Sequence, residues 1–323
     1  MLRKFSYRRA TSVQAAAVAA TRSGARILAG GTDLLGCLRD GVFAADTVVS
    51  LTGIKALRGI SARPGGGLRI GALTTLSEVA SDPRILNSYP VLSQAAAAAA
   101  SPQLRNQGTI GGNICQRPRC WYFRGDFHCL RKGGDICFAV AGESEFHCIF
   151  GGAPCFIVHP SDTAPALVAL DATVSIAGAK AARTVPLASF FVLPAESAVK
   201  ENVLAPGELV TEILLGPPQA GTRGMYRKVR ERGAFDFALA GAAVVVAMAG
   251  KQVSAVRIVL SGVAPIPWRC ADAEKLLVGR PLDPATVAQA ATAAVKDAVP
   301  LSKNEYKVIL VRGVLEETLL ALA

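Results

Sequence analysis

Residues 25–35 read ARILAGGTDLL, a short apolar run that enters two glycines and leaves along an apolar helical face. Adjacent glycines permit backbone conformations closed to other residues and allow a ligand to approach the main chain closely. Where such a turn opens a helix, its amides suit a pyrophosphate. A purely structural turn explains one Gly-Gly pair equally well. The stretch lacks the GxGxxG fingerprint, which argues against a Rossmann domain.

The first third of the chain alternates strand-like and helix-like segments. Strands are predicted at 4–8, 25–29, 47–51 and 67–70, and helices from Ser12, at 75–80 and at 91–100. Thr75 and Glu78 have the spacing of a capping box. This alternation favours an α/β architecture.

A second glycine pair lies in Thr109-Ile110-Gly111-Gly112-Asn113, predicted as a tight loop over 108–113. It repeats the chemistry of the first pair, and its threonine and asparagine can donate to ribityl or phosphate oxygens. Ser161-Asp162-Thr163 then begins a predicted helix at 164–170, before a strand at 173–176. For this third element, a plain N-cap is the alternative to a ligand contact.

Six of the eight cysteines crowd into residues 115–155. Four of them, Cys120, Cys129, Cys137 and Cys155, are spaced C-x8-C-x7-C-x17-C. Residues 115–158 show no period of 2 or 3.6, and a long aperiodic segment in a compact chain is normally functional or disordered. The cysteine density indicates function, through covalent or metal chemistry.

Zinc binding, disulfide formation and inert burial are all possible roles for these cysteines. Structural zinc sites usually draw ligands from close C-x2–4-C pairs, and none of these four spacings is short. Disulfides would require an oxidising compartment, whereas no secretory signal is expected here. Inert burial is the default for the isolated Cys37 and Cys270.

Residues 217–221 (PPQAG) are predicted to be a linker. Strands at 242–248 and 256–260 follow, with helices at 270–278, 284–298 and 305–320. The predicted domains are therefore 1–216, which includes the aperiodic insertion at about 115–158, and an α+β domain at 217–323.

Composition narrows the class of protein. Hydrophobic residues make up 51% and charged residues 18%, so disorder is not expected. The net charge is +11, but basic runs interleaved with aromatics are only short, as at 226–232. A solvated basic face or a contact for an acidic partner therefore explains the charge better than nucleic-acid binding. The longest uncharged apolar run, 237–249, is too short for a membrane span. Arg8-Arg9 only imitates an export signal. The expected location is the cytoplasm, or the periplasm by co-export with a signal-bearing partner.

The order GGTDLL (30–35), TIGGN (109–113) and HPSDTAPAL (159–167) resembles the FAD-binding subunit of the xanthine dehydrogenase and molybdenum hydroxylase family. YRKVR (226–230) and AFDFA (234–238) extend the similarity beyond the linker. The resemblance implies a two-part α/β FAD-binding domain of the vanillyl-alcohol-oxidase (PCMH) type, followed by a C-terminal α+β domain.

By this resemblance, the first loop cradles the FAD pyrophosphate and the second lies along the ribityl chain and flavin. Asp162 would contact the adenosine side or polar groups of the flavin. Lys228 would reach the isoalloxazine edge, with a surface cation as the alternative. The implied FAD-binding residues are Leu28, Ala29, Gly30, Gly31, Thr32, Asp33, Leu34, Thr109, Gly111, Gly112, Asn113, Ser161, Asp162 and Lys228.

The insertion is similar to that in the flavin subunits of 4-hydroxybenzoyl-CoA reductase and of periplasmic aldehyde oxidoreductase, where it holds a 4Fe-4S cluster. This similarity implies that Cys120, Cys129, Cys137 and Cys155 are its ligands. Soft, anionic sulfur suits iron, and four thiolates close a cubane. Cys148 is the alternative to Cys155 as the last ligand.

The resemblance implies an electron-transfer subunit without catalytic side chains, because a flavin carries out its own redox chemistry. Its implied partners are a small subunit with 2Fe-2S clusters and a large subunit with the molybdenum cofactor, in a heterotrimer or a dimer of heterotrimers. Ferredoxin or oxygen would be the external acceptor. A stand-alone flavin oxidase or dehydrogenase and a zinc-stabilised binding module are the competing interpretations.

Overall fold

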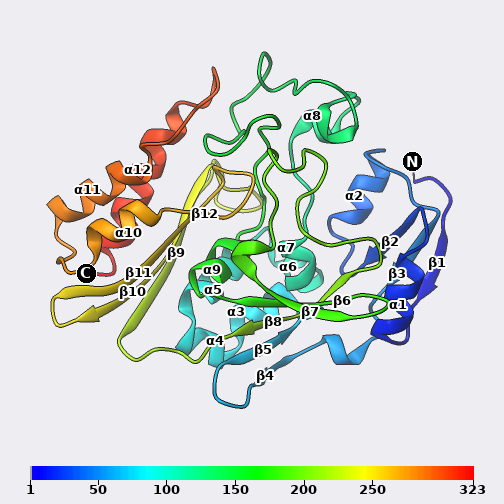
Figure 1. Ribbon diagram of the computed structural model, residues 1–323, viewed down its shortest axis with the longest axis horizontal. Coiled ribbons are helices and arrows are strands. Elements are labelled where there is room, and N and C mark those ends of the chain that lie inside the picture. Colours follow the sequence, from blue (N-terminus) through cyan, green and yellow to red (C-terminus); the bar gives the residue numbers. More distant parts are fainter. Residues whose placement is uncertain (1) are drawn as a thin grey trace.

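Three separate β-sheets organise the protein in a computed structural model that describes residues 2–323. Their strand orders are β1-β3-β2, β4-β5-β8-β6-β7 and β12-β11-β10-β9. The sheets follow one another across the molecule in Figure 1, with the N-terminal sheet and the C-terminal helices at opposite ends.

The N-terminal sheet is parallel and carries the first glycine pair at its edge. It consists of β1 (Ser6–Arg9), β2 (Ala25–Leu28) and β3 (Thr47–Ser50), joined through α1 (Val13–Ala20) and α2 (Leu34–Arg39). Ser12 caps α1 by accepting a hydrogen bond from Ala15 N (3.1 Å). The glycine pair thus lies between a strand and a helix, as its sequence predicts.

The central sheet is antiparallel and supports most of the core. Its strands are β4 (Ile60–Ala62), β5 (Leu68–Gly71), β6 (Thr173–Ala177), β7 (Ala182–Pro186) and β8 (Leu209–Leu215). Around it lie α3 (Leu76–Ser81), α4 (Pro83–Ser88), α5 (Pro90–Ala98), α6 (Pro102–Gln107), α7 (Ile110–Ile114) and α9 (Thr163–Ala169). The short turns η1 (Lys55–Leu57) and η3 (Leu187–Ser189) complete this part. The sheet and helices share one buried apolar cluster.

Helix starts follow the capping chemistry of the sequence, with one correction. The capping box predicted for Thr75 and Glu78 is present at the start of α3. The predicted tight loop at 108–113 is wrong in part, since residues 110–114 form α7. Thr109 caps this helix by accepting a hydrogen bond from Gly112 N (3.2 Å), which gives the glycines a helical path.

The C-terminal domain is an antiparallel sheet buried on both faces. It contains β9 (Thr222–Val229), β10 (Ala240–Ala249), β11 (Gln252–Ser261) and β12 (Trp268–Arg269). Helices α10 (Ala271–Leu277), α11 (Pro284–Ala294) and α12 (Tyr306–Leu320) cover its outer side, and α5 and α9 approach from the other (Figure 1). Burial on both sides explains why β10 is apolar throughout.

The cysteine-rich insertion has little regular structure, limited to α8 (Trp121–Arg124) and η2 (Leu130–Lys132). The C-terminal domain holds its later part in place. Asn304 Nδ2 donates to the carbonyls of His147 (3.0 Å) and Cys148 (3.2 Å), and buried Lys307 donates to those of Phe146 (3.3 Å) and Gly262 (2.8 Å). Together with backbone hydrogen bonds from Ile149 N (2.9 Å) and Phe150 N (3.1 Å) to Val263 O, these side-chain donors fix the later part of the insertion.

Candidate functional site

A cavity of about 1010 Å³ opens between the N-terminal sheet, the central helices and the insertion. Both glycine pairs line it, although residues 32–110 separate them in sequence. The predicted binding residues in its wall are Ala29, Gly30, Gly31, Thr32, Asp33, Leu34, Thr109, Gly111, Gly112, Asn113 and Asp162. The two loops therefore form one site.

Close backbone packing requires glycine at two of these positions. A Cβ on Gly30 would lie 2.0 Å from Gln107 O, and one on Gly111 would lie 2.8 Å from the Ala72 Cβ. Gly31 has a φ of +77°, which side-chain-bearing residues rarely adopt. The pairs thus shape the cavity by letting neighbouring backbones meet beneath it.

Asp33 fastens the insertion to the first loop. Its carboxylate accepts hydrogen bonds from Arg117 N (2.8 Å) and Arg124 Nη2 (2.7 Å), and Arg119 Nη2 lies 3.0 Å away. Arg117 and Arg119 also line the cavity, and the buried Nε of Arg119 has no hydrogen-bond partner within residues 2–323. Burial lowers the pKa of Arg119. Two arginines in this wall suit an anionic ligand.

Asn113 is fixed by two hydroxyl groups from the start of α9. Ser161 Oγ and Thr163 Oγ1 both donate to Asn113 Oδ1 (2.6 Å each). Since its oxygen is occupied, the amide group of Asn113 is the donor left for the cavity. Ser161 itself faces a smaller adjoining cavity of about 250 Å³.

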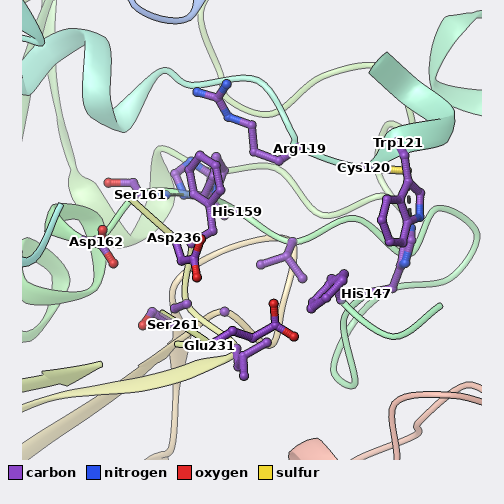
Figure 2. Close-up of a pocket in the computed structure, with 17 residues that line it drawn as sticks. Arg119, Cys120, Trp121, His147, His159, Ser161, Asp162, Glu231, Asp236 and Ser261 are labelled. Atoms are coloured by element: carbon purple, nitrogen blue, oxygen red, sulfur yellow. Dashed lines mark hydrogen bonds between the residues drawn. The ribbon is translucent and has the colours of Figure 1, made fainter. Parts of the chain in front are cut away.

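The smaller cavity continues the larger one toward the insertion. Figure 2 shows Ser161, Asp162 and His159 on one side of it, Trp121 and His147 on the other, and Arg119 across the top. Both cavities share residues in their walls: Arg119, Pro160, Asp162, Asp236 and Phe237.

Asp162 joins this site to the C-terminal sheet. Its carboxylate accepts hydrogen bonds from Tyr226 Oη (2.7 Å) and Lys228 Nζ (2.8 Å), which lie two residues apart on β9. Burial raises the pKa of Asp162, and Lys228 opposes that change. Lys228 is not among the residues that line the cavity, and neither is Leu28. The lysine instead holds the carboxylate that does line it.

A separate small cavity, of about 10 Å³, lies inside the insertion. Its wall contains all four predicted cluster ligands, Cys120, Cys129, Cys137 and Cys155. Cys148 is buried but does not line it. The insertion therefore gathers four thiols that are up to 35 residues apart in sequence.

The thiols are surrounded by hydrogen-bond donors. Hydrogen bonds from the Cys155 thiol and from the amides of Phe156 and Ala139 lower the pKa of Cys137 to about 6. The same Cys155–Cys137 hydrogen bond raises the pKa of Cys155. His147 Nε2 lies 3.3 Å from Cys120 Sγ, and Arg131 Nε donates to Cys155 Sγ (3.4 Å). Within residues 2–323, no three His, Cys, Asp or Glu side chains converge closely enough for one metal ion. The thiols border a cavity instead.

Several lining residues were not identified from the sequence as part of a site. Arg117, Arg119, Phe123 and Arg131 come from the aperiodic insertion, and Phe235 comes from the segment after β9. The similarity of AFDFA to the family was the one available signal for Phe235. No local sequence pattern identifies the four insertion residues as part of the site, because contacts with residues distant in sequence determine their positions.

Sequence profiles match both parts of the chain. A profile described as the FAD-binding domain in molybdopterin dehydrogenase matches residues 3–218, and one for the CO dehydrogenase flavoprotein C-terminal domain matches residues 225–322. Among the described residues, no helix is both long and apolar enough to cross a bilayer.

Individual proteins are similar over most or nearly all of their length. The aldehyde oxidoreductase FAD-binding subunit PaoB of Escherichia coli K12 is 36% identical over 98% of each chain. The carbon monoxide dehydrogenase medium chain of Hydrogenophaga pseudoflava is 30% identical over 84% of this chain and 79% of its own. A solved structure of carbon monoxide dehydrogenase from that organism superposes with a TM-score of 0.79, at 28% identity over 99% of this chain and 97% of the other.

Proposed function

Since the chain belongs to the family of FAD-binding medium subunits of xanthine dehydrogenase and CO dehydrogenase, we propose that it transfers electrons between FAD and iron–sulfur centres within a molybdenum hydroxylase complex. The full-length similarity confirms both the family resemblance and the predicted fold class, a mixed α/β FAD-binding part with a separate C-terminal domain. Related chains are named subunits or medium chains of oxidoreductases.

The large cavity fits FAD in size and chemistry. Pockets for ligands of drug size or larger reach about 1,000 Å³, and this one is of that order. Gly30 and Gly111 let neighbouring backbone segments pack closely behind its wall, Arg117 and Arg119 give the wall positive charge, and the fixed Asn113 offers an amide donor. FAD, when bound, provides exchange between two-electron and one-electron steps. The protein holds and orients it and shields it from water.

The cavity inside the insertion that the four cysteines line, called here the cysteine cavity, fits an iron–sulfur cluster through its donor set. Four cysteines around one cavity match the ligand number of a 4Fe-4S centre. Donors that include the amides of Phe156 and Ala139 favour the thiolate of Cys137, whereas burial raises the pKa of Cys120. Such a centre supplies one-electron exchange. Cys155, rather than Cys148, is the fourth ligand in this proposal, because only Cys155 borders the cavity.

One observation carries the proposal: the large cavity of about 1010 Å³ and the cysteine-lined cavity inside the insertion share a wall. Phe123 and Arg131 line both the large cavity and the cysteine cavity. Two redox groups held there would be separated by single side chains, an arrangement that serves electron exchange and has no evident use in a zinc-stabilised binding module.

The proposed complex contains two further kinds of subunit. A small subunit with 2Fe-2S clusters would deliver electrons, and a large subunit with the molybdenum cofactor would act on substrate, in a heterotrimer or a dimer of heterotrimers. Ferredoxin or oxygen would accept the electrons. The complex would reside in the cytoplasm, or in the periplasm if a signal-bearing partner carries it there.

Anaerobic purification of the full chain with its native partners tests the proposal. We expect three kinds of polypeptide, bound FAD, and roughly four iron and four acid-labile sulfide atoms in this chain. Stoichiometric zinc without iron would refute the cluster. A single active polypeptide would favour the stand-alone flavin enzyme, and colourless protein would refute the flavin.

A further inference from the structure

Arg131 is a buried cation that forms part of the wall between the two cavities. Its side chain is 1% exposed, and it borders the large cavity on one side and the cysteine cavity on the other. Phe123, the other shared residue, is also buried. Because Phe123 is apolar, Arg131 is the charged group of this partition.

Each part of the guanidinium has a different environment. Nε donates to Cys155 Sγ (3.4 Å), and Nη1 donates to Glu201 Oε1 (2.6 Å) and to Lys200 O (3.3 Å). The buried Nη2 has no partner within the described chain. Leaving such a donor unsatisfied is costly, so an ordered water or a bound group is expected to complete this environment.

Glu201 connects the two sides of the wall. It is buried, and its second oxygen lies 3.0 Å from Arg117 Nε, on the wall of the large cavity. A chain of contacts therefore runs from Cys155 through Arg131 and Glu201 to Arg117. Charges in such a low-dielectric region act strongly on their neighbours.

We propose that Arg131 is a positioning residue that orients Cys155 and sets the reduction potential of the iron–sulfur centre relative to the flavin, with Glu201 as its counterion. The inference rests on the proposed function. When the centre gains one electron it becomes one charge more negative, and the adjacent guanidinium stabilises that charge. Removing the cation therefore disfavours reduction, and removing the Glu201 charge favours it.

Two variants with opposite expected signs test this inference. In the anaerobically purified complex, Arg131→Met should lower the reduced-to-oxidised ratio of the cluster about tenfold at a fixed potential, equivalent to about 59 mV for one electron. Glu201→Gln should raise that ratio, and Arg131→Lys should restore part of the loss. The measurement is an EPR-monitored redox titration, with iron and FAD content determined on the same samples.

Arg269→Met is the matched control. Arg269 pairs with buried Glu274 (2.7 Å) in the C-terminal domain, although its own side chain is 46% exposed, and it lines neither cavity. The cluster potential and the cofactor content of the Arg269→Met variant should equal those of the wild type.

The outcomes separate this inference from the proposed function. A wild-type protein without iron would refute the cluster itself. Intact clusters with equal potentials, or shifts of the same sign in Arg131→Met and Glu201→Gln, would refute the role of Arg131. If Arg131→Met loses its iron, Glu201→Gln alone tests the role of Arg131: a raised reduced-to-oxidised ratio supports it, and an unchanged or lowered ratio refutes it.

Discussion

The Lys228 ammonium lies 2.8 Å from Asp162 Oδ2, and the side chains of both residues are less than a tenth exposed. Tyr226 donates to the other carboxylate oxygen, so a single acidic group joins β9 to the start of α9. The C-terminal domain therefore supports the wall of the large cavity through this carboxylate, and damage to the pair should affect both stability and flavin retention.

Asp162→Ala should destabilise the protein by about 3–5 kcal/mol, because it leaves Lys228 charged, buried and unpaired. Adding Lys228→Met should recover part of this loss. Urea unfolding of the two variants measures the effect, with bound FAD recorded in parallel. As a control, Arg257→Met removes an exposed pair with Asp171 and should cost no more than about 1 kcal/mol. A loss of stability below about 1 kcal/mol in Asp162→Ala would contradict the conclusion that Asp162 and Lys228 form a buried ion pair.

Lys228 also illustrates what the sequence could predict. The alternation of a strand places Tyr226 and Lys228 on one face of β9, and family similarity marked the lysine as functional. Neither signal revealed that its ammonium ends on Asp162, 66 residues earlier. Local patterns predicted the strands and the helix caps because those features depend on neighbouring residues, whereas the tight loop predicted at 108–113 is partly the helix α7.

The insertion shows the opposite case. Its cysteines were recognisable by number and spacing, since thiol chemistry needs a fixed set of ligands. Arg119 and Arg131 were not recognisable, because Asp33 and Glu201, 86 and 70 residues away, place them. An aperiodic segment gives no rule for such long-range ion pairs.

Cys155→Ser should abolish the iron–sulfur centre, whereas Cys148→Ser should retain it. A hydroxyl is a harder and less anionic ligand than a thiolate, and Cys155 borders the cysteine cavity while Cys148 does not. Iron and sulfide analysis after anaerobic purification measures the outcome, and FAD content indicates whether each variant has folded. Loss of iron in Cys148→Ser alone would reassign the fourth ligand.

Gly31→Ala should reduce FAD occupancy through backbone strain at the cavity. Gly31 has a φ of +77°, and an added Cβ would lie 3.2 Å from Leu28 Cδ1. An L-residue in this conformation costs roughly 1–2 kcal/mol. Gly279→Ala is the control, because Gly279 has a φ of +78° with open space around it in the C-terminal domain.

Both glycine variants should therefore lose similar stability, but only Gly31→Ala should lose flavin. Visible absorbance per protein chain measures the occupancy. A bulky residue at Gly112, where a Cβ would meet Thr109 Oγ1 at 3.0 Å, should have the same effect on FAD. Unchanged flavin content in both loop variants would remove these loops from the site.

His159 should make the protein less stable as the pH falls from 6.5 toward 4. Burial lowers its pKa from 6.5 to about 4, and its ring packs edge-on against Phe191 with centroids 4.7 Å apart. Between these two values the unfolded chain takes up a proton that the folded chain does not, so acid favours unfolding. The contribution is complete above pH 6.5 and declines by about 2 kcal/mol at pH 5.

His159→Gln should flatten this dependence, even though the substitution itself lowers stability at about pH 7.5. The readout is the difference in unfolding free energy between about pH 7.5 and about pH 5, measured on flavin-loaded protein. His128→Gln, at an exposed position, should preserve the wild-type difference. An equal pH dependence in His159→Gln and the wild type would show that the buried ring becomes protonated in the folded protein without penalty.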